Sequence, residues 1–148
     1  MDPNAWLDIS IPLENGMVAW PGSVGFTLSA TSSMAEGAHA NNSKIATDVH
    51  IGTHVDAPSH SVAGGGTVEQ MPLQALIGPA YVVYLPAPDY IDQDALEKAG
   101  IPAEAERLLI RTKNSVLWET PQTKFRKDFV GLMPDAATWI AGRGLKIV

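Results

Sequence analysis

One stretch of eleven residues, from His50 to His60, constrains the fold of this chain more than any other. It reads His-Ile-Gly-Thr-His-Val-Asp-Ala-Pro-Ser-His and holds three of the four histidines of the 148-residue sequence, together with one aspartate. Imidazole and carboxylate are the ligands that a borderline divalent cation such as Zn²⁺ takes in an open catalytic site. The fold is therefore expected to bring these side chains to one point, and metal binding is the first hypothesis.

The backbone of this stretch is expected to be extended, because β-branched residues alternate through it. On a strand, His50, His54 and Asp56 share one face. The two histidines would still lie about 13 Å apart at ~3.3 Å per residue, whereas metal–ligand bonds are only ~2 Å long. The chain must bend between them, and Gly52 is the residue that bends most readily. A helix is disfavoured, since Gly52 and Pro58 are poor residues for a helix interior.

Two chemical tasks can be divided among these side chains. His50, His54 and Asp56 are candidate ligands that leave a position for water, and Zn²⁺ lowers the pKa of such a water to about 7. A turn at Pro58 can return His60 to the metal without making it a ligand, and an imidazole with a pKa near ~6.5 suits a general acid or base. In the competing interpretation each histidine is an ordinary surface residue, but four polar groups at this spacing rarely coincide.

The stretch resembles the signature of the cyclase / kynurenine formamidase-like family, His-x-Gly-Thr-His-x-Asp-x-Pro-x-His, and matches it at every fixed position. The resemblance implies that His50, His54 and Asp56 bind a divalent metal and that His60 is the acid/base. Family members hydrolyse N-formylkynurenine, isatin or related amides and lactams. The resemblance thus implies a metal-dependent hydrolase of C–N bonds other than peptide bonds, with a small aromatic amide or lactam as substrate. The donor set of two His and one Asp suits Zn²⁺ or Mn²⁺ as cofactor.

A further candidate is Trp20, a large ring in the turn-forming run Trp20-Pro21-Gly22. Two interpretations stay open. The ring can pack on the edge of the core, or it can form an aromatic wall for a planar substrate. Family members carry a similar Trp-Pro-Gly near the N-terminus, so Trp20 is carried forward as a substrate-binding residue.

Length and composition exclude several classes of protein. The chain is expected to form one domain over residues 1–148, and 45% apolar with 18% charged residues is typical of soluble globular proteins. A net charge of −6 disfavours nucleic-acid and acidic-membrane partners. The absence of cysteine excludes disulfides and thiolate sites, and the first residues show no basic-then-apolar segment. A cytoplasmic location is therefore expected.

Patterns of apolar residues, glycine and proline predict the elements. Strands are expected at residues 6–11, 17–20, 26–32, 43–51, 80–85, 107–112 and 145–148. Short helices are expected at residues 72–76, 95–99 and 135–140, the last two capped by Asp92 or Asp94 and by Asp135. The run at 80–85 suits a central strand. The order of segments resembles the family's α/β fold, a swivelling β/β/α arrangement in which a mixed β-sheet core carries a few outer helices.

The C-terminus departs from the family pattern. The chain stops at Val148, within an expected strand, whereas family members continue well beyond this point with a further His and Glu. A shortened form is therefore expected, as is a homo-oligomer that covers the exposed sheet edge. Shortening also motivates an alternative function, a catalytically weak or inactive paralogue with a metal-binding or regulatory role. A dehydratase or cyclase acting on another carbonyl substrate is a third possibility.

Overall fold

The structure is a computed structural model that describes residues 6–86, 89–120 and 122–148. It divides into two compact units, the first comprising Met1–Asp56 with Gln122–Phe125 and the second Ala57–Pro121 with Arg126–Val148. Helices and paired strands both occur, so the predicted α/β class is confirmed. Residues 1–5, on which the absence of a signal segment was judged, lie outside the described residues. The assignment of the whole chain to one domain stays a prediction.

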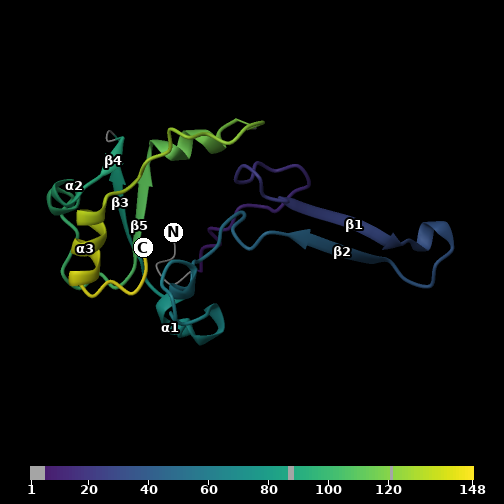
Figure 1. Ribbon diagram of the computed structural model, residues 1–148, viewed down its shortest axis with the longest axis horizontal. Coiled ribbons are helices and arrows are strands. Elements are labelled where there is room, and N and C mark those ends of the chain that lie inside the picture. The colour runs from purple at the N-terminus through teal and green to yellow at the C-terminus, as the bar shows by residue number, and fades with distance from the viewer. Residues whose placement is uncertain (1–5, 87–88, 121) are drawn as a thin grey trace. The chain divides into compact units, whose positions relative to one another are not determined.

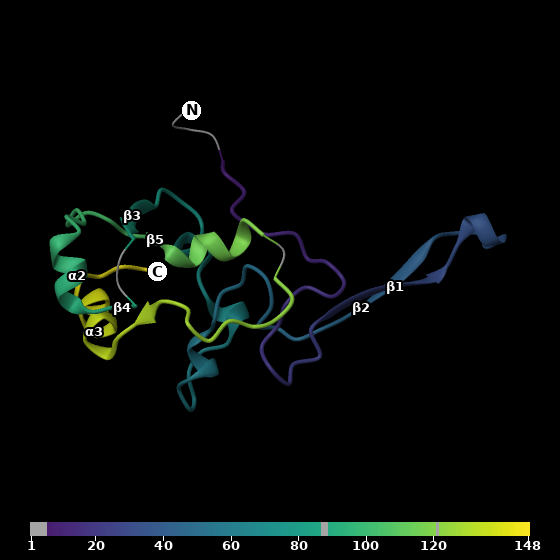
Figure 2. The same ribbon diagram turned by 90° about the horizontal axis from the view of Figure 1, so that it is seen from above.

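The first unit contains a two-stranded antiparallel ribbon, seen clearly in Figures 1 and 2. Strand β1 spans Phe26–Ser32 as predicted and pairs with β2, Asn42–Thr47, with Phe26 opposite Thr47. Strand β2 ends earlier than the predicted 43–51, because the backbone bends after Thr47 toward the histidine stretch. The far turn contains a short 3-10 helix, Met34–Glu36.

The strands predicted at residues 6–11 and 17–20 are wrong, because these residues form turns and irregular backbone. Single side chains replace the ladders that strands would need. The Asn15 side chain accepts from the Leu28 N–H at 2.6 Å and donates to the Leu28 carbonyl at 2.9 Å, so it occupies the edge of β1. The N–H of Ile11 donates to Thr53 Oγ1 at 3.0 Å instead of to a strand.

The second unit packs two helices beside a pair of parallel strands. Strand β3, Tyr81–Leu85, pairs in step with β5, Leu108–Thr112. Helices α2, Gln93–Lys98, and α3, Pro134–Gly142, lie next to each other on one side of this pair (Figures 1 and 2). The remaining elements are helix α1, Leu73–Leu76, and the short parallel pair β4, Tyr90–Ile91, with β6, Gly131–Leu132. One apolar cluster joins β3, β4, β5, α2 and α3: Val83, Ile91, Leu96, Ile101, Leu108, Val130, Ala136 and Ile140.

The starts of the two longer helices show which capping predictions were right. Asp92 caps α2, since its Oδ1 accepts the Ala95 N–H at 2.8 Å. Asp135 does not cap α3, because Pro134, which lacks an N–H and suits the first helical position, places the cap at Met133. Asp135 instead accepts the N–H of Gln93 at 3.2 Å, which ties the start of α3 to the start of α2.

The strands of the described residues form three two-stranded sheets. The run at 80–85 forms β3 as predicted but not as a central strand, because β5 is its only partner there and Val82 and Tyr84 are exposed. The strand predicted at 145–148 amounts to one parallel bridge between Ile147 and Arg107, with the Leu108 N–H donating to the Ile147 carbonyl at 3.0 Å.

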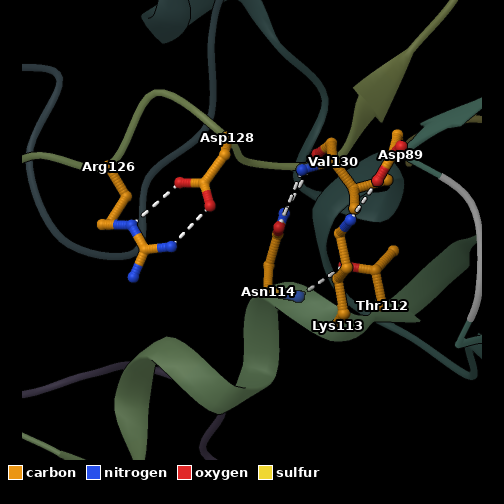
Figure 3. A network of polar contacts seen from close by, with 7 residues as sticks. All are labelled: Asp89, Thr112, Lys113, Asn114, Arg126, Asp128 and Val130. Atoms are coloured by element: carbon orange, nitrogen blue, oxygen red, sulfur yellow. Dashed lines mark hydrogen bonds and ion pairs between the residues drawn. The ribbon is translucent and has the colours of Figure 1, made fainter.

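Polar contacts fix the segment that leads into β6 (Figure 3). Asn114 lies in the 3-10 helix Lys113–Trp118, and its side chain accepts from the Val130 N–H at 2.8 Å and donates to the Val130 carbonyl at 3.0 Å. The Asn114 amide thereby makes the two hydrogen bonds to Val130 that a neighbouring strand would make. Ion pairs join Lys113 to Asp89 and Arg126 to Asp128 on the same surface. Across the described residues, no helix has the length and apolar character needed to cross a membrane.

Candidate metal centre

The histidine stretch turns sharply at Gly52, as its position in the sequence predicted. Gly52 has a φ of +63°, a left-handed conformation that other residues adopt only with strain. Its Cα also lies close to Leu13, since a Cβ at this position would meet Leu13 Cδ2 at 2.5 Å. The neighbouring Ile51 side chain is buried and anchors the turn. Glycine is therefore required for both the conformation and the space.

The turn brings the three predicted ligands together. His50 Nδ1 lies 2.8 Å from Asp56 Oδ1, and His54 Nε2 lies 3.5 Å from the same oxygen. The two imidazole rings are 5.3 Å apart between centroids and inclined by 71°. The side chains are between one third and one half exposed, so an ion can enter from solvent. The bend therefore removes the separation of about 13 Å that a straight strand would place between His50 and His54.

Hydrogen bonding fixes the tautomer of His54. Its Nδ1 lies 3.0 Å from the Gly52 carbonyl oxygen, which can only accept, so Nδ1 carries the proton. In the neutral ring Nε2 then presents a lone pair toward Asp56 Oδ1, which also only accepts. Two acceptors that face each other can share either a proton or a metal cation. A backbone carbonyl holding the second ring nitrogen is also the usual support of a metal-binding histidine. The donor types therefore suit a divalent ion, and their role as ligands stays a prediction.

Asp48 is a polar residue of this region that sequence reasoning missed. Its Oδ2 accepts hydrogen bonds from the Ser23 hydroxyl and, at 2.8 Å, from the Val24 N–H. The hydrogen bond from Ser23 is the largest cause that holds the pKa of Asp48 below its ordinary value. Asp48, two positions before His50, thus ties the loop after Trp20 to the histidine stretch. In the strand predicted over residues 43–51, Asp48 and His50 share one face, and this parity is the signal that could have identified it.

Trp20 borders a cavity of about 430 Å³ that lies entirely within the first unit. Its ring meets Phe125 edge to face, with centroids 4.8 Å apart and planes inclined by 65°. Trp20 is 61% exposed, and its role in substrate binding stays a prediction. Phe125 is 105 positions further along the sequence, and no local pattern linked the two.

His60 belongs to the second unit and ends a short 3-10 helix, Pro58–His60. Pro58 starts this turn at a position where its missing N–H costs nothing. The loop that follows folds back on it, because the Ser59 N–H donates to the Gly66 carbonyl at 3.0 Å. The turn predicted at Pro58 is confirmed, and the role of His60 stays a prediction.

Comparison with known proteins places the chain in a family. The chain belongs to the Cyclase family, whose sequence model, described as "Putative cyclase", matches residues 7–148. It is 30% identical over 148 residues to the kynurenine formamidase of Bacillus cereus, covering all of this chain and 68% of that protein. It is 36% identical over 143 residues to cyclase-like protein 3 of Oryza sativa subsp. japonica, covering 90% of this chain and 52% of that protein.

Two solved structures are similar to most of this chain. One is described as a potential metal-dependent hydrolase with cyclase activity, with a TM-score of 0.73 and 31% identity over 94% of this chain and 63% of that chain. The other is described as a predicted metal-dependent hydrolase from Bacillus stearothermophilus, with a TM-score of 0.71 and 30% identity over 94% of this chain and 64% of that chain. The chain therefore spans less than two thirds of the length of these solved chains.

Proposed function

We propose that this chain binds a divalent metal ion, Zn²⁺ or Mn²⁺, through His50, His54 and Asp56, and that it belongs to a hydrolase of amide bonds. Among such enzymes the proposal favours an arylformamidase, which converts N-formylkynurenine to kynurenine and formate, or an isatin-type lactam hydrolase. The observation that carries the proposal is the approach of the His50 and His54 rings to one carboxylate oxygen, Asp56 Oδ1. The names of the relatives support the same class.

The proposed roles follow from the chemistry of each side chain. His50, His54 and Asp56 hold the ion, which when bound supplies Lewis acidity and a water that ionises near neutral pH. His60 takes a proton as the carbonyl is attacked and returns one to the departing amine, as a general base and acid. The exposed ring of Trp20 packs against the aromatic part of the substrate.

Hydrolysis measurements test the proposal. The metal-loaded chain is assayed with a formanilide, isatin and an aryl ester, and we expect turnover of the first or second that a chelator abolishes. We expect His60→Ala to retain the metal and lose turnover by about 10²-fold or more, the usual contribution of a general acid or base. His39→Ala is the matched control, because His39 is exposed in the turn before β2 and outside the cluster.

Two other outcomes identify the competing functions. A chain that holds metal but turns over no amide, lactam or ester is a metal-binding or regulatory protein. Turnover restricted to dehydration or ring closure of another carbonyl substrate identifies a dehydratase or a cyclase, and cyclase activity is named for one solved relative. Metal-independent amide hydrolysis contradicts the proposal itself.

We also propose that the chain self-associates. Every strand of a two-stranded sheet has an unpaired edge, and such ribbons are marginally stable alone. All six residues of β2 are exposed. Sedimentation at micromolar protein is expected to show a homo-oligomer, and a monomer at every concentration contradicts this.

A further inference from the structure

We infer that the cavity beside Trp20 binds an aromatic ring that carries an acidic group, with the Lys124 ammonium as its counter-charge. The inference rests on the proposed function and adds to it the charge of the substrate. The cavity, of about 430 Å³, falls within the range of small-molecule sites. All of its lining residues belong to the first unit, so the site is defined without reference to the second.

The aromatic specificity follows from two rings at the cavity wall. Trp20 and Phe125 both line it, and their edge-to-face contact turns one ring across the other. This leaves most of the indole in solvent, at 61% exposure. An indole face exposed at a cavity offers apolar area to a planar ligand, and an added aromatic ring finds the stacked or edge-on geometry that such rings prefer.

The charge specificity follows from Lys124. It is the one charged residue among the described lining residues, which also include the hydroxyls of Ser23, Thr27 and Thr123. Among the described residues, none forms an ion pair or hydrogen bond with the Lys124 side chain. The Lys124 ammonium at the cavity attracts an anionic ligand and repels a cationic one.

The Asp48 carboxylate, which contacts the cavity wall, is already hydrogen-bonded. Asp48 accepts from the Ser23 hydroxyl and the Val24 N–H, and both of those residues line the cavity. These hydrogen bonds hold the cavity wall in place, and they use the charged Asp48 Oδ2 to bind the loop that contains Ser23 and Val24. Hydroxyl donors and one ammonium therefore remain to receive a carboxylate.

Binding of benzoate and benzamide to the full chain tests the inference by calorimetry. The two probes share a ring and a similar shape and differ in charge. We expect wild type to prefer benzoate, and Lys124→Gln to weaken benzoate about fivefold, the most that an exposed charge pair usually gives. Benzamide is expected to bind the variant as it binds wild type, and Lys124→Arg is expected to retain benzoate binding.

Two controls separate the possible sources of an effect. Lys44→Gln removes an exposed lysine of β2 that does not line the cavity, and we expect no change. Repeating the benzoate titration with a chelator present removes any contribution from a metal ion. Benzoate binding that is equal in wild type and Lys124→Gln, or that disappears with chelator in both, overturns the inference.

Failure of this inference and failure of the proposed function are distinguishable. Lys124-dependent benzoate binding by a chain that hydrolyses no amide supports the cavity and rejects the hydrolase. Amide hydrolysis that ignores both the charge of the substrate and Lys124 rejects the cavity alone. If both hold, we expect Lys124→Gln to raise KM for an acidic aryl amide about fivefold with little change in kcat.

Discussion

The second unit buries eight apolar side chains in one cluster, whereas the first buries only Phe26 and Ile51 among its described apolar residues. The three candidate metal ligands lie in the sparsely packed unit. The geometry of the first unit depends instead on specific polar contacts, such as the hydrogen bond that the Thr53 hydroxyl accepts from the Ile11 N–H. Packing stabilises one unit, and local conformation shapes the site in the other.

This difference has a consequence for metal binding. A site held by few buried contacts gains stability when an ion joins its ligands, because binding to the folded form adds free energy by mass action. The second unit has no such dependence, since its cluster is complete without an ion. Substitutions in the two units are therefore expected to separate effects on unfolding from effects on the site.

The largest expected effect is on the packed cluster. Leu96 of helix α2 is fully buried. The substitution Leu96→Ala therefore leaves a cavity and is expected to lower the free energy of unfolding by about 2–5 kcal/mol. Leu28→Ala in β1 is the control, because Leu28 is 47% exposed and its loss is expected to cost below ~1 kcal/mol. Equal losses in chemical denaturation would remove the contrast between the units.

A smaller loss of stability with a larger loss of metal is expected for Gly52→Ala. Alanine at a φ of +63° costs about 1–2 kcal/mol, and its Cβ also displaces Leu13, so the ligands on either side no longer converge. Metal affinity is expected to fall about tenfold or more, measured by titration. Gly37→Ala shares a positive φ, at +91°, but has open space around it and is expected to keep the metal.

The loop that carries His60 offers a third comparison. A Cβ on Gly65 would lie 2.8 Å from the Pro58 carbonyl carbon, so Gly65→Ala must displace the turn that ends at His60. Crowding of this kind costs about 1–3 kcal/mol. We expect turnover of the amide substrate to fall with metal content unchanged. Gly142→Ala in α3 meets nothing within 4 Å and is expected to leave both unaffected; equal turnover in the two variants would refute the positional role of the loop.

The smallest expected effect is electrostatic and lies in the second unit. Glu106 pairs with Lys146 at 2.8 Å and with the buried Arg107 at 3.2 Å, and the hydrogen bond from Lys146 is the main cause that lowers the pKa of Glu106 below its ordinary value of 4.5. A lowered pKa in the folded state contributes stability above the ordinary value, and this is lost as pH falls through the folded value.

Thermal unfolding across pH measures this contribution. We expect Glu106→Gln to melt slightly below wild type at neutral pH and to approach it under acid conditions, where the carboxylate of the wild type is protonated. Glu104→Gln, which replaces an exposed glutamate in the same loop, is expected to match wild type throughout. A difference between Glu106→Gln and wild type that grows toward acid pH would have the wrong sign for this account.

Local sequence signals predicted those parts of the structure that depend on neighbouring residues. The bounds of β1, the Asp92 cap and the turn at Gly52 each follow from a few adjacent residues, and each is confirmed. The same bend, within seven residues, brings His50 next to Asp56, while their role as metal ligands stays a prediction.

Local sequence signals did not predict contacts between residues that are distant in the sequence. Residues 17–20 carry a strand-like pattern, but the Asn15 side chain occupies the edge of β1, a pairing 13 positions away that periodicity does not encode. The contact of Phe125 with Trp20 and the hydrogen bonds of Asp48 to the Trp20 loop are of the same kind. Periodicity reports which face a residue prefers, and not which partner it meets.

Metal titration of the full chain tests the central claim most directly. The claim is that His50, His54 and Asp56 share an ion, so wild type and the control His39→Ala are expected to bind about one Zn²⁺ or Mn²⁺ per chain, and His50→Ala, His54→Ala and Asp56→Asn to bind it at least about tenfold more weakly. Equal binding by all five proteins, or no binding by wild type, would contradict it.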